Sequence, residues 1–309
     1  MKLVFMGTPD FAVPTLKTLA ASKHKVLAVI TQPDKPKGRG KEYKASPVKE
    51  AALEAGIPVW QPAKVRDEAF VNMLAGWEPD AIIVAAFGQI LPESILSLPR
   101  YGCINVHASL LPKYRGSAPI QYAVINGEEK SGVTAMLMDK GIDTGDMYQK
   151  REVLLDEKET GDSLHDKLCV LGGELILSVL DELEAGTAVR TPQREEEATH
   201  TKMLTKEMGH IDFSMSASQI ERLIRGLNSW PSAYTHIGGK TLKIWEADVI
   251  DREYSGVPGE IAEVTADALI VRTGRGALVL KEVQLEGKKR MDTAAFLRGC
   301  PVEKGTILQ

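Results

Sequence analysis

Residues 103–119 read CINVHASLLPKYRGSAP, and they join an apolar run to a polar end. The run from Cys103 to His107 is predicted to be a buried strand. Because side chains alternate between the two faces of a strand, Asn105 and His107 lie on the same face. A carboxamide and an imidazole then sit side by side at the carboxyl end of a strand, where open α/β sheets bind their ligands.

Two short loops are predicted to wall a pocket beside this strand end. Ser109-Leu110-Leu111-Pro112 is apolar and is stiffened by its proline, which suits a flat ligand. The loop at 87–92 follows another buried run, at 81–86, and therefore also starts at a strand's carboxyl end. We expect both loops to line the same site.

The first 185 residues alternate between apolar runs and helical patterns. Strands are predicted at 3–6, 26–31, 57–60, 81–86, 103–107, 133–138 and 147–155, and helices at 11–21, 46–55, 67–77, 119–125 and 163–183. This alternation is typical of an α/β fold with a Rossmann-like doubly wound sheet. We expect antiparallel strands near its end. The turn at Gly7 lacks the pattern G-x-G-x-x-G, so a tight strand–helix turn is favoured over dinucleotide binding.

The sequence changes character after residue 188. A catalytic domain is predicted at 1–188, a linker with proline and an acidic triplet at 189–205, and a smaller domain at 206–309. Short runs broken by glycines in the last segment favour a C-terminal β-barrel, OB-like in type. Its 14 basic and 14 acidic residues are balanced, so only their arrangement could make one face basic.

Composition narrows the class of protein. The 309-residue chain is 43% hydrophobic and has a net charge of −4, which fits a globular protein rather than an overall nucleic-acid binder. Three widely spaced cysteines fit neither a disulfide framework nor a metal site. The apolar N-terminal run is too short for a signal peptide or a membrane span. We therefore expect a cytoplasmic protein with no membrane contact and no metal.

One local patch departs from this acidic balance. Residues 34–44 carry four lysines and one arginine against Asp34 and Glu42. Two prolines and two glycines within residues 32–44 argue against helix or strand there. The segment is either a solvated surface loop or an arm that contacts phosphates. The concentration of charge favours the arm, with contacts from Lys35, Lys37, Arg39 and Lys41.

Asp143 completes a candidate catalytic trio with Asn105 and His107. A carboxylate beside an imidazole favours its charged form, so His107 can act as acid or base, and a carboxamide can stabilise an oxyanion. Taken singly, the three residues have ordinary explanations: a strand-end histidine, a turn cap and an Asx-type turn. Because Cys103 lies deeper in the strand and no serine occupies a nucleophile's place, the trio suits direct transfer through a tetrahedral intermediate.

The motifs of this region resemble those of the folate-dependent formyltransferases. They are Asn-x-His with Ser-Leu-Leu-Pro at 105–112, Tyr-Arg-Gly-Ser-Ala-Pro-Ile at 114–120 and Gly-Ile-Asp-Thr-Gly-Asp at 141–146. Motifs at 7–11, 31–34, 38–41, 46–49 and 230–231 are similar to those of the members that act on methionyl-tRNA. One departure is Ala108, where the family commonly has glycine.

The resemblance implies a reaction, and it implies roles. The formyl donor is 10-formyltetrahydrofolate, and the acceptor is the α-amino group of methionine on initiator tRNA, for translation initiation. Asn105, His107 and Asp143 match the catalytic trio, and Ser109, Leu110, Leu111 and Pro112 match the folate-binding segment. Arg39 and its basic neighbours match the loop that enters the acceptor stem, and the C-terminal domain would bind tRNA. The family implies a monomer.

Two alternatives stay open from the residues. One is a formyltransferase that acts on a small amine, such as an amino sugar nucleotide or a glycinamide ribonucleotide, with the same trio. The basic segment and the long second domain argue against the glycinamide, and a sugar nucleotide leaves the basic segment unexplained. The other is a non-catalytic RNA-binding module, which retention of the whole trio disfavours.

Overall fold

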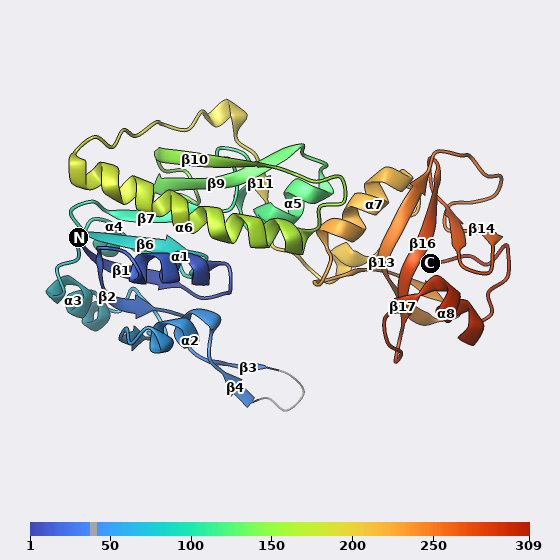
Figure 1. The fold of residues 1–309 in the computed structure, drawn as a ribbon, viewed down its shortest axis with the longest axis horizontal. Helices are drawn as coiled ribbons and strands as arrows, with labels where there is room; N and C mark the ends of the chain where they lie inside the picture. Colours follow the sequence, from blue (N-terminus) through green and yellow to red (C-terminus); the bar gives the residue numbers. More distant parts are fainter. Residues whose placement is uncertain (38–41) are drawn as a thin grey trace. The chain divides into compact units, whose positions relative to one another are not determined.

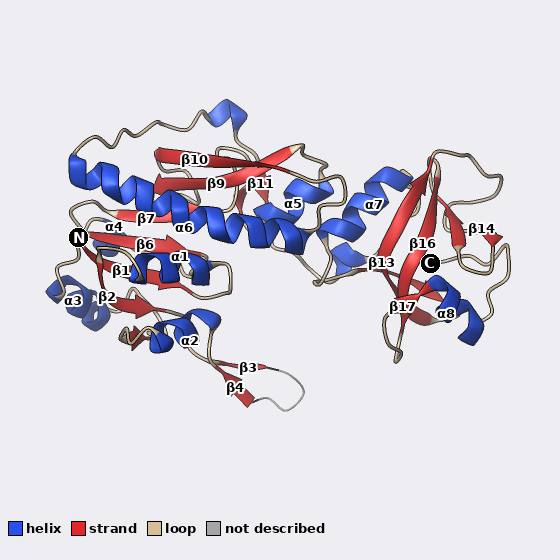
Figure 2. Ribbon diagram, in the orientation of Figure 1, coloured by secondary structure: helices blue, strands red, loops and turns tan. Residues whose placement is uncertain are grey.

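The computed structural model describes residues 1–37 and 42–309, and its chain forms two compact units. The first unit comprises residues 1–119, 130–154 and 165–201, and the second comprises 120–129, 155–164 and 202–309. Figure 1 labels the elements, and Figure 2 shows that the first mixes helices with strands while the second is mainly strands. Among the described residues, no helix is both long and apolar enough to cross a membrane.

A seven-stranded sheet forms the centre of the first unit, in the order β10-β9-β7-β6-β1-β2-β5. The strands β5, β2, β1, β6 and β7 are parallel, whereas β9 and β10 run antiparallel at one edge. The predicted Rossmann-like sheet with antiparallel strands near its end is confirmed. The bounds are β1 Lys2–Gly7, β2 Lys25–Ile30, β5 Val59–Trp60, β6 Ala81–Ala85, β7 Cys103–His107, β9 Lys130–Leu137 and β10 Met147–Leu154.

Helices cover both faces of this sheet, which explains its nearly continuous apolar strands. On one face, Phe70 and Leu74 of α3 and Ile95 of α4 pack with a row of strand residues that includes Cys103. On the other, α6 approaches β7 so closely that a Cβ added at Gly172 would lie 2.9 Å from Val106. The bounds are α1 Ala12–Ala20, α2 Pro47–Glu54, α3 Glu68–Gly76, α4 Glu93–Leu96 and α6 Gly161–Ala185. Helix α5, Pro119–Ile125, belongs to the second unit from residue 120 on.

Helix α2 begins as its sequence predicts. The Ser46 side chain accepts a hydrogen bond from the backbone N–H of Lys49 at 3.1 Å, and Pro47 occupies the first turn, where its missing N–H costs nothing. Ser46 also contacts Thr31 at the end of β2, 2.7 Å between hydroxyl oxygens. The helix start is therefore fixed to the sheet.

The basic segment before α2 differs from the expectation of an irregular loop. Strands β3 (Lys35–Lys37) and β4 (Glu42–Lys44) form an antiparallel ribbon in which Pro36 faces Tyr43. The prediction that proline excludes a strand here was wrong, because each strand of a two-stranded ribbon is an edge strand and edges tolerate proline. At the base, Asp34 accepts from Lys49 at 2.6 Å and from Gln61 at 2.7 Å, and these partners lower the pKa of its carboxyl.

The second unit is built on an antiparallel sheet in the order β12-β13-β16-β15-β14, with β17 paired to β16. Helix α7 contacts β13 and β16, and α8 contacts β16 and β17. Ile220 and Ile224 of α7 and Phe296 of α8 belong to its buried apolar core. The bounds are α7 Ala217–Gly226, β12 Ala233–Ile237, β13 Lys240–Ile250, β14 Ile261–Val264, β15 Leu269–Arg272, β16 Ala277–Leu285, β17 Met291–Asp292 and α8 Thr293–Gly299.

Candidate active site

Strand β7 carries Asn105 and His107 at its carboxyl end, on the face predicted from the alternation. The two residues are nearly buried, with 9% and 7% of their surface exposed. Cys103 lies deeper on the same face and is fully buried, and burial raises the pKa of its thiol to about 12. Such a thiol is not a nucleophile near neutral pH, which agrees with the expectation that the substrate supplies the attacking group.

The structure brings Asp143 to these two residues from a distant point of the chain. Strand β9 runs antiparallel to β7, so Leu137 at its end pairs with Ile104 near the beginning of β7. The loop from 138 to 146 then returns toward His107. The Asp143 carboxylate lies 3.6 Å from His107 Nδ1 through Oδ2, and its Oδ1 accepts from Asn105 Nδ2 at 3.5 Å.

The orientation of both polar side chains follows from their partners. His107 Nε2 lies 2.9 Å from the carbonyl oxygen of Tyr114, and since a carbonyl only accepts, Nε2 carries a hydrogen. His107 Nδ1 therefore faces Asp143. The backbone N–H of Gly116 donates to Asp143 Oδ2 at 2.8 Å, so the carboxylate is also held from the segment after β7.

The backbone around this trio adopts conformations that few residues tolerate. Asp143 has φ of 55°, and Ala86, Tyr114 and Ala118 also have positive φ. Aspartate adopts this region more readily than most residues. Gly145 has a different constraint, since a Cβ there would lie 1.7 Å from the carbonyl oxygen of Leu137. Strained backbone of this kind is typical of functional sites.

Sequence reasoning missed two residues that hold this loop, Arg115 and Gln193. Gln193 Nε2 donates to the carbonyl oxygens of Asp143 and Gly145, each at 2.8 Å. Arg115 is 2% exposed and donates through Nε to Gln193 Oε1 at 3.0 Å. Gln193 lies in the segment predicted as a linker, which belongs to the first unit as far as Thr201.

This segment is hydrogen-bonded to the loops of the site. Strand β11 (His200–Thr201) pairs in parallel with β8 (Arg115–Gly116), and Thr191 exchanges two backbone hydrogen bonds with Met147. No local pattern marks Gln193 as part of the site, because its partners Asp143 and Arg115 lie about 50 and 80 positions earlier in the chain.

The predicted folate segment lies directly after β7. Ser109, Leu111 and Pro112 are buried and Leu110 is half-buried. Thr134 of β9 anchors the segment, because its hydroxyl donates to the carbonyl of Ser109 at 2.6 Å and accepts from the N–H of Leu111 at 3.1 Å. The side chains of Ile90 and Ile142, in the adjacent loops, are 84% and 65% exposed.

Of the four predicted tRNA contacts, Lys35 and Lys37 lie on strand β3. Lys35 is exposed, and Lys37 ends β3. Arg39 and Lys41 lie outside the described residues.

Two family models match successive segments of the chain. A family model described as "Formyl transferase" matches residues 1–180, and one described as "Formyl transferase, C-terminal domain" matches residues 203–301. The methionyl-tRNA formyltransferase of Agathobacter rectalis is 59% identical over 99% of both chains. That of Lachnospira eligens is 55% identical over 100% of this chain and 99% of its own. The chain belongs to the methionyl-tRNA formyltransferase family.

Solved structures at lower identity share the fold. WlaRD, a sugar 3N-formyl transferase crystallised in the presence of dTDP and 5-N-formyl-THF, has a TM-score of 0.68 and 18% identity, covering 94% of this chain and 99% of its own. HypX from Aquifex aeolicus, in complex with tetrahydrofolic acid, has a TM-score of 0.62 and 18% identity. That match covers 100% of this chain, which spans 50% of HypX. These structures show the formyltransferase fold, and the relatives at 59% and 55% identity show that the chain is a formyl-transferring enzyme.

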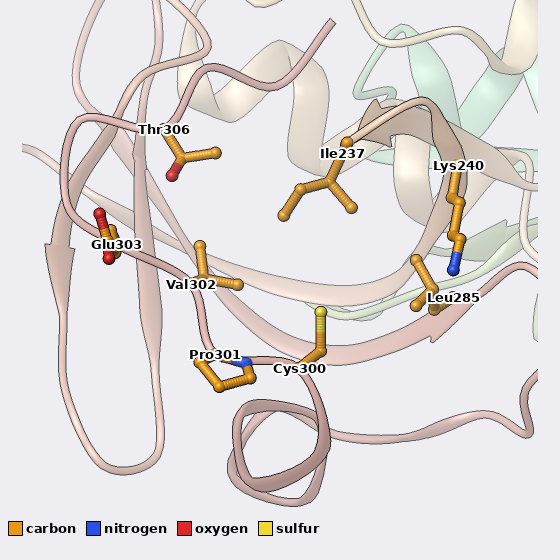
Figure 3. A pocket seen from close by; sticks show the side chains of 9 residues that line it. Ile237, Lys240, Leu285, Cys300, Pro301, Val302, Glu303 and Thr306 are labelled. Atoms are coloured by element: carbon orange, nitrogen blue, oxygen red, sulfur yellow. The ribbon is translucent and has the colours of Figure 1, made fainter.

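In this methionyl-tRNA formyltransferase family member, two cavities lie away from the catalytic trio. Figure 3 shows one in the second unit, with a volume of about 440 Å³, where Cys300 and Val302 face Ile237 and Leu285. A cavity of about 480 Å³ in the first unit lies against His165 and Cys169. Burial raises the pKa of Cys169 to about 12. None of the predicted site residues that the structure describes lines either cavity.

Proposed function

We propose that this chain transfers the formyl group of 10-formyltetrahydrofolate directly to the α-amino group of methionine on initiator tRNA, in the cytoplasm, for translation initiation. The observation that carries the mechanism is the convergence of Asn105, His107 and Asp143 next to a thiol that is buried and protonated. Without a protein nucleophile, the amine attacks the formyl carbon itself, and the reaction passes through a tetrahedral intermediate.

The three residues of the trio divide the work of the transfer. An α-amino group has a pKa of roughly 7.7–8.0 in peptides, so a useful neutral fraction exists without a strong base. Asn105 Nδ2 carries two hydrogens, one directed at Asp143 and one free for the developing oxyanion. Protonated His107 adds positive charge there, and Asp143 stabilises that charge from 3.6 Å. Asp143 also guides a proton, through water, to the leaving folate nitrogen.

The folate donor fits the apolar surroundings of the trio. Leu110 is half-buried beside the site, and Ile90 and Ile142 expose apolar side chains that suit a flat aromatic ligand. Ser109, Leu111 and Pro112 are buried and shape this wall from behind. The tetrahydrofolate compounds crystallised with WlaRD and HypX support the same class of donor.

The tRNA acceptor accounts for the basic ribbon and the second domain. The basic segment can neutralise phosphates of the tRNA through the positive charges of Lys35, Lys37, Arg39 and Lys41. We assign formyl transfer to residues 1–188, a connecting role to 189–205 and tRNA binding to 206–309, in a monomer that uses no metal.

Formyl transfer to an amino sugar nucleotide is the second candidate, and it needs the same trio. WlaRD, a sugar formyltransferase, shares this fold, but at 18% identity the likeness supports the fold alone. Relatives above 50% identity are named for methionyl-tRNA. The acceptor is therefore tRNA.

A competition between acceptors tests this. The purified protein is incubated with 10-formyltetrahydrofolate labelled in the formyl group and with methionyl initiator tRNA, uncharged initiator tRNA or an amino sugar nucleotide. Label is expected only on the charged tRNA, and Arg39→Ala should raise the KM for tRNA more than that for folate. Label on the sugar nucleotide alone would overturn the proposed acceptor.

A further inference from the structure

Beyond the trio, the site depends on a chain of hydrogen bonds that starts at the protein surface. Glu195, with a side chain 77% exposed, accepts from Arg115 through both carboxylate oxygens at 3.1 and 2.9 Å. Arg115 in turn donates to Gln193, and Gln193 donates to the loop that carries Asp143. The predicted linker thus contacts the catalytic loop through one carboxamide.

The chemistry of this chain fixes which way the Gln193 amide points. Arg115 has only donors, so the Gln193 atom at 3.0 Å from its Nε must be the oxygen. The nitrogen then faces the carbonyl oxygens of Asp143 and Gly145, and each of its two hydrogens has one acceptor. Reversing the amide would set an oxygen against two carbonyl oxygens and an NH₂ against a guanidinium.

The loop needs such a tie because of its path. It leaves β9 at the edge where β7 begins and must fold back to bring Asp143 to His107. Its backbone at Asp143 has φ of 55°, a region that costs energy for residues other than glycine. The two carbonyl groups that Gln193 holds, at 143 and 145, lie on either side of Thr144.

We propose that Gln193 is a positioning residue for formyl transfer: its carboxamide holds the backbone of Asp143 and Gly145, and Arg115 keeps that carboxamide in the active orientation. The inference rests on the proposed role of Asp143. Gln193 itself makes no contact with the substrates in this scheme. Its effect on the rate passes entirely through the placement of the Asp143 carboxylate.

Gln193→Glu tests this with little change in shape. The glutamate keeps the contact with Arg115 but sets a carboxylate oxygen against the two carbonyl groups. Displacing a catalytic group by about 1 Å can cost ~10² in rate, so kcat is expected to fall by roughly 10- to 100-fold, with both KM values within about twofold. Glu196→Gln, an exposed change in the same segment, is the matched control and should leave kcat within about twofold.

A double-mutant cycle separates positioning from a general structural role. In an Asp143→Asn background there is no carboxylate left to place, so adding Gln193→Glu should cost less than about twofold. An equal loss of kcat in both backgrounds would overturn the proposal, as would full activity of the single variant. If Gln193→Glu does not fold, Gln193→Met keeps the length, removes the donors and is expected to behave in the same way.

Hydrogen exchange at 139–146 gives a readout that needs no substrate. Both Gln193 variants should exchange faster there than the wild type, with the rest of the sheet unchanged. Exchange rates at 139–146 that equal those of the wild type would overturn the proposal that Gln193 holds this loop. The wild type could instead formylate no tRNA while both variants still exchange faster than it does. That result would count against the proposed function but would support the proposal that Gln193 holds this loop.

Discussion

The Arg115–Glu195 pair offers a quantitative test of what stabilises the catalytic loops, because its partners differ so much in exposure. Arg115 is 2% exposed, whereas the Glu195 side chain is 77% exposed. If the pair acted as a buried ion pair, removing either partner would cost several kcal/mol. If the glutamate stays solvated, removing Glu195 should cost much less free energy of unfolding than removing Arg115.

The magnitudes follow from the contacts. Glu195→Gln removes a largely solvated charge and should cost less than ~1 kcal/mol. Arg115→Met retains most of the buried volume but leaves Gln193 Oε1 without its donor, which costs about 2 kcal/mol. Arg115→Ala also removes about two methylene-sized groups at ~0.8 kcal/mol each and leaves space behind them, for a total of about 4 kcal/mol.

Urea unfolding at pH 7 measures this series. Trp60 and Trp77 report on the first unit once Trp230 and Trp245 of the second unit are replaced by phenylalanine. Arg194→Met, which removes an exposed pair with Glu197, is the control and should change the free energy of unfolding by less than ~0.5 kcal/mol. A loss for Glu195→Gln as large as that for Arg115→Met would refute the reasoning.

Three further outcomes are expected. Thr134→Val removes the hydroxyl that bonds Ser109 and Leu111, so the KM for the formyl donor should rise about fivefold while the KM for tRNA stays unchanged. An equal rise in both KM values would argue against folate binding by this segment. Lys23 and the N-terminal ammonium lower the pKa of Glu184 to about 2 from 4.5, so the folded state binds fewer protons. The difference in free energy of unfolding between the wild type and Glu184→Gln should be largest above pH 4.5 and should vanish as the pH falls toward 2. A difference that does not change with pH would contradict this. Iodoacetamide at pH 8 should label Cys300 first in the native protein. Burial raises the pKa of Cys103 and of Cys169 to about 12, so only ~10⁻⁴ of each is thiolate at that pH. Early labelling of Cys169 would contradict this expectation.

The sequence predicted the parts of the fold that depend on local pattern. Continuous apolar runs indicated the parallel strands, and the alternation in 103–107 put Asn105 and His107 on one face. Ser46 and Pro47 marked the start of α2. Each of these features is decided within a few residues of chain.

The features that sequence reasoning missed depend on long-range contacts. Gln193 and Arg115 are 78 positions apart, and the proline and acidic triplet near Gln193 are typical of a linker. Buried arginines are rare, so composition gave no reason to expect Arg115 in the interior. The ribbon of β3 and β4 was missed for a different reason, since Pro36 excludes a central strand but not the edge strand of a two-stranded ribbon.

The central claim is that Asn105, His107 and Asp143 perform the transfer together, with no protein nucleophile. The most direct measurement is the single-turnover rate of formyl transfer to methionyl initiator tRNA by His107→Ala and Asp143→Asn, with the unfolding midpoint of each variant measured alongside. We expect each variant to lose at least ~10² in rate with little change in stability, as removal of an oxyanion donor or a proton-transfer group does. Rates near that of the wild type would contradict the assignment of the trio.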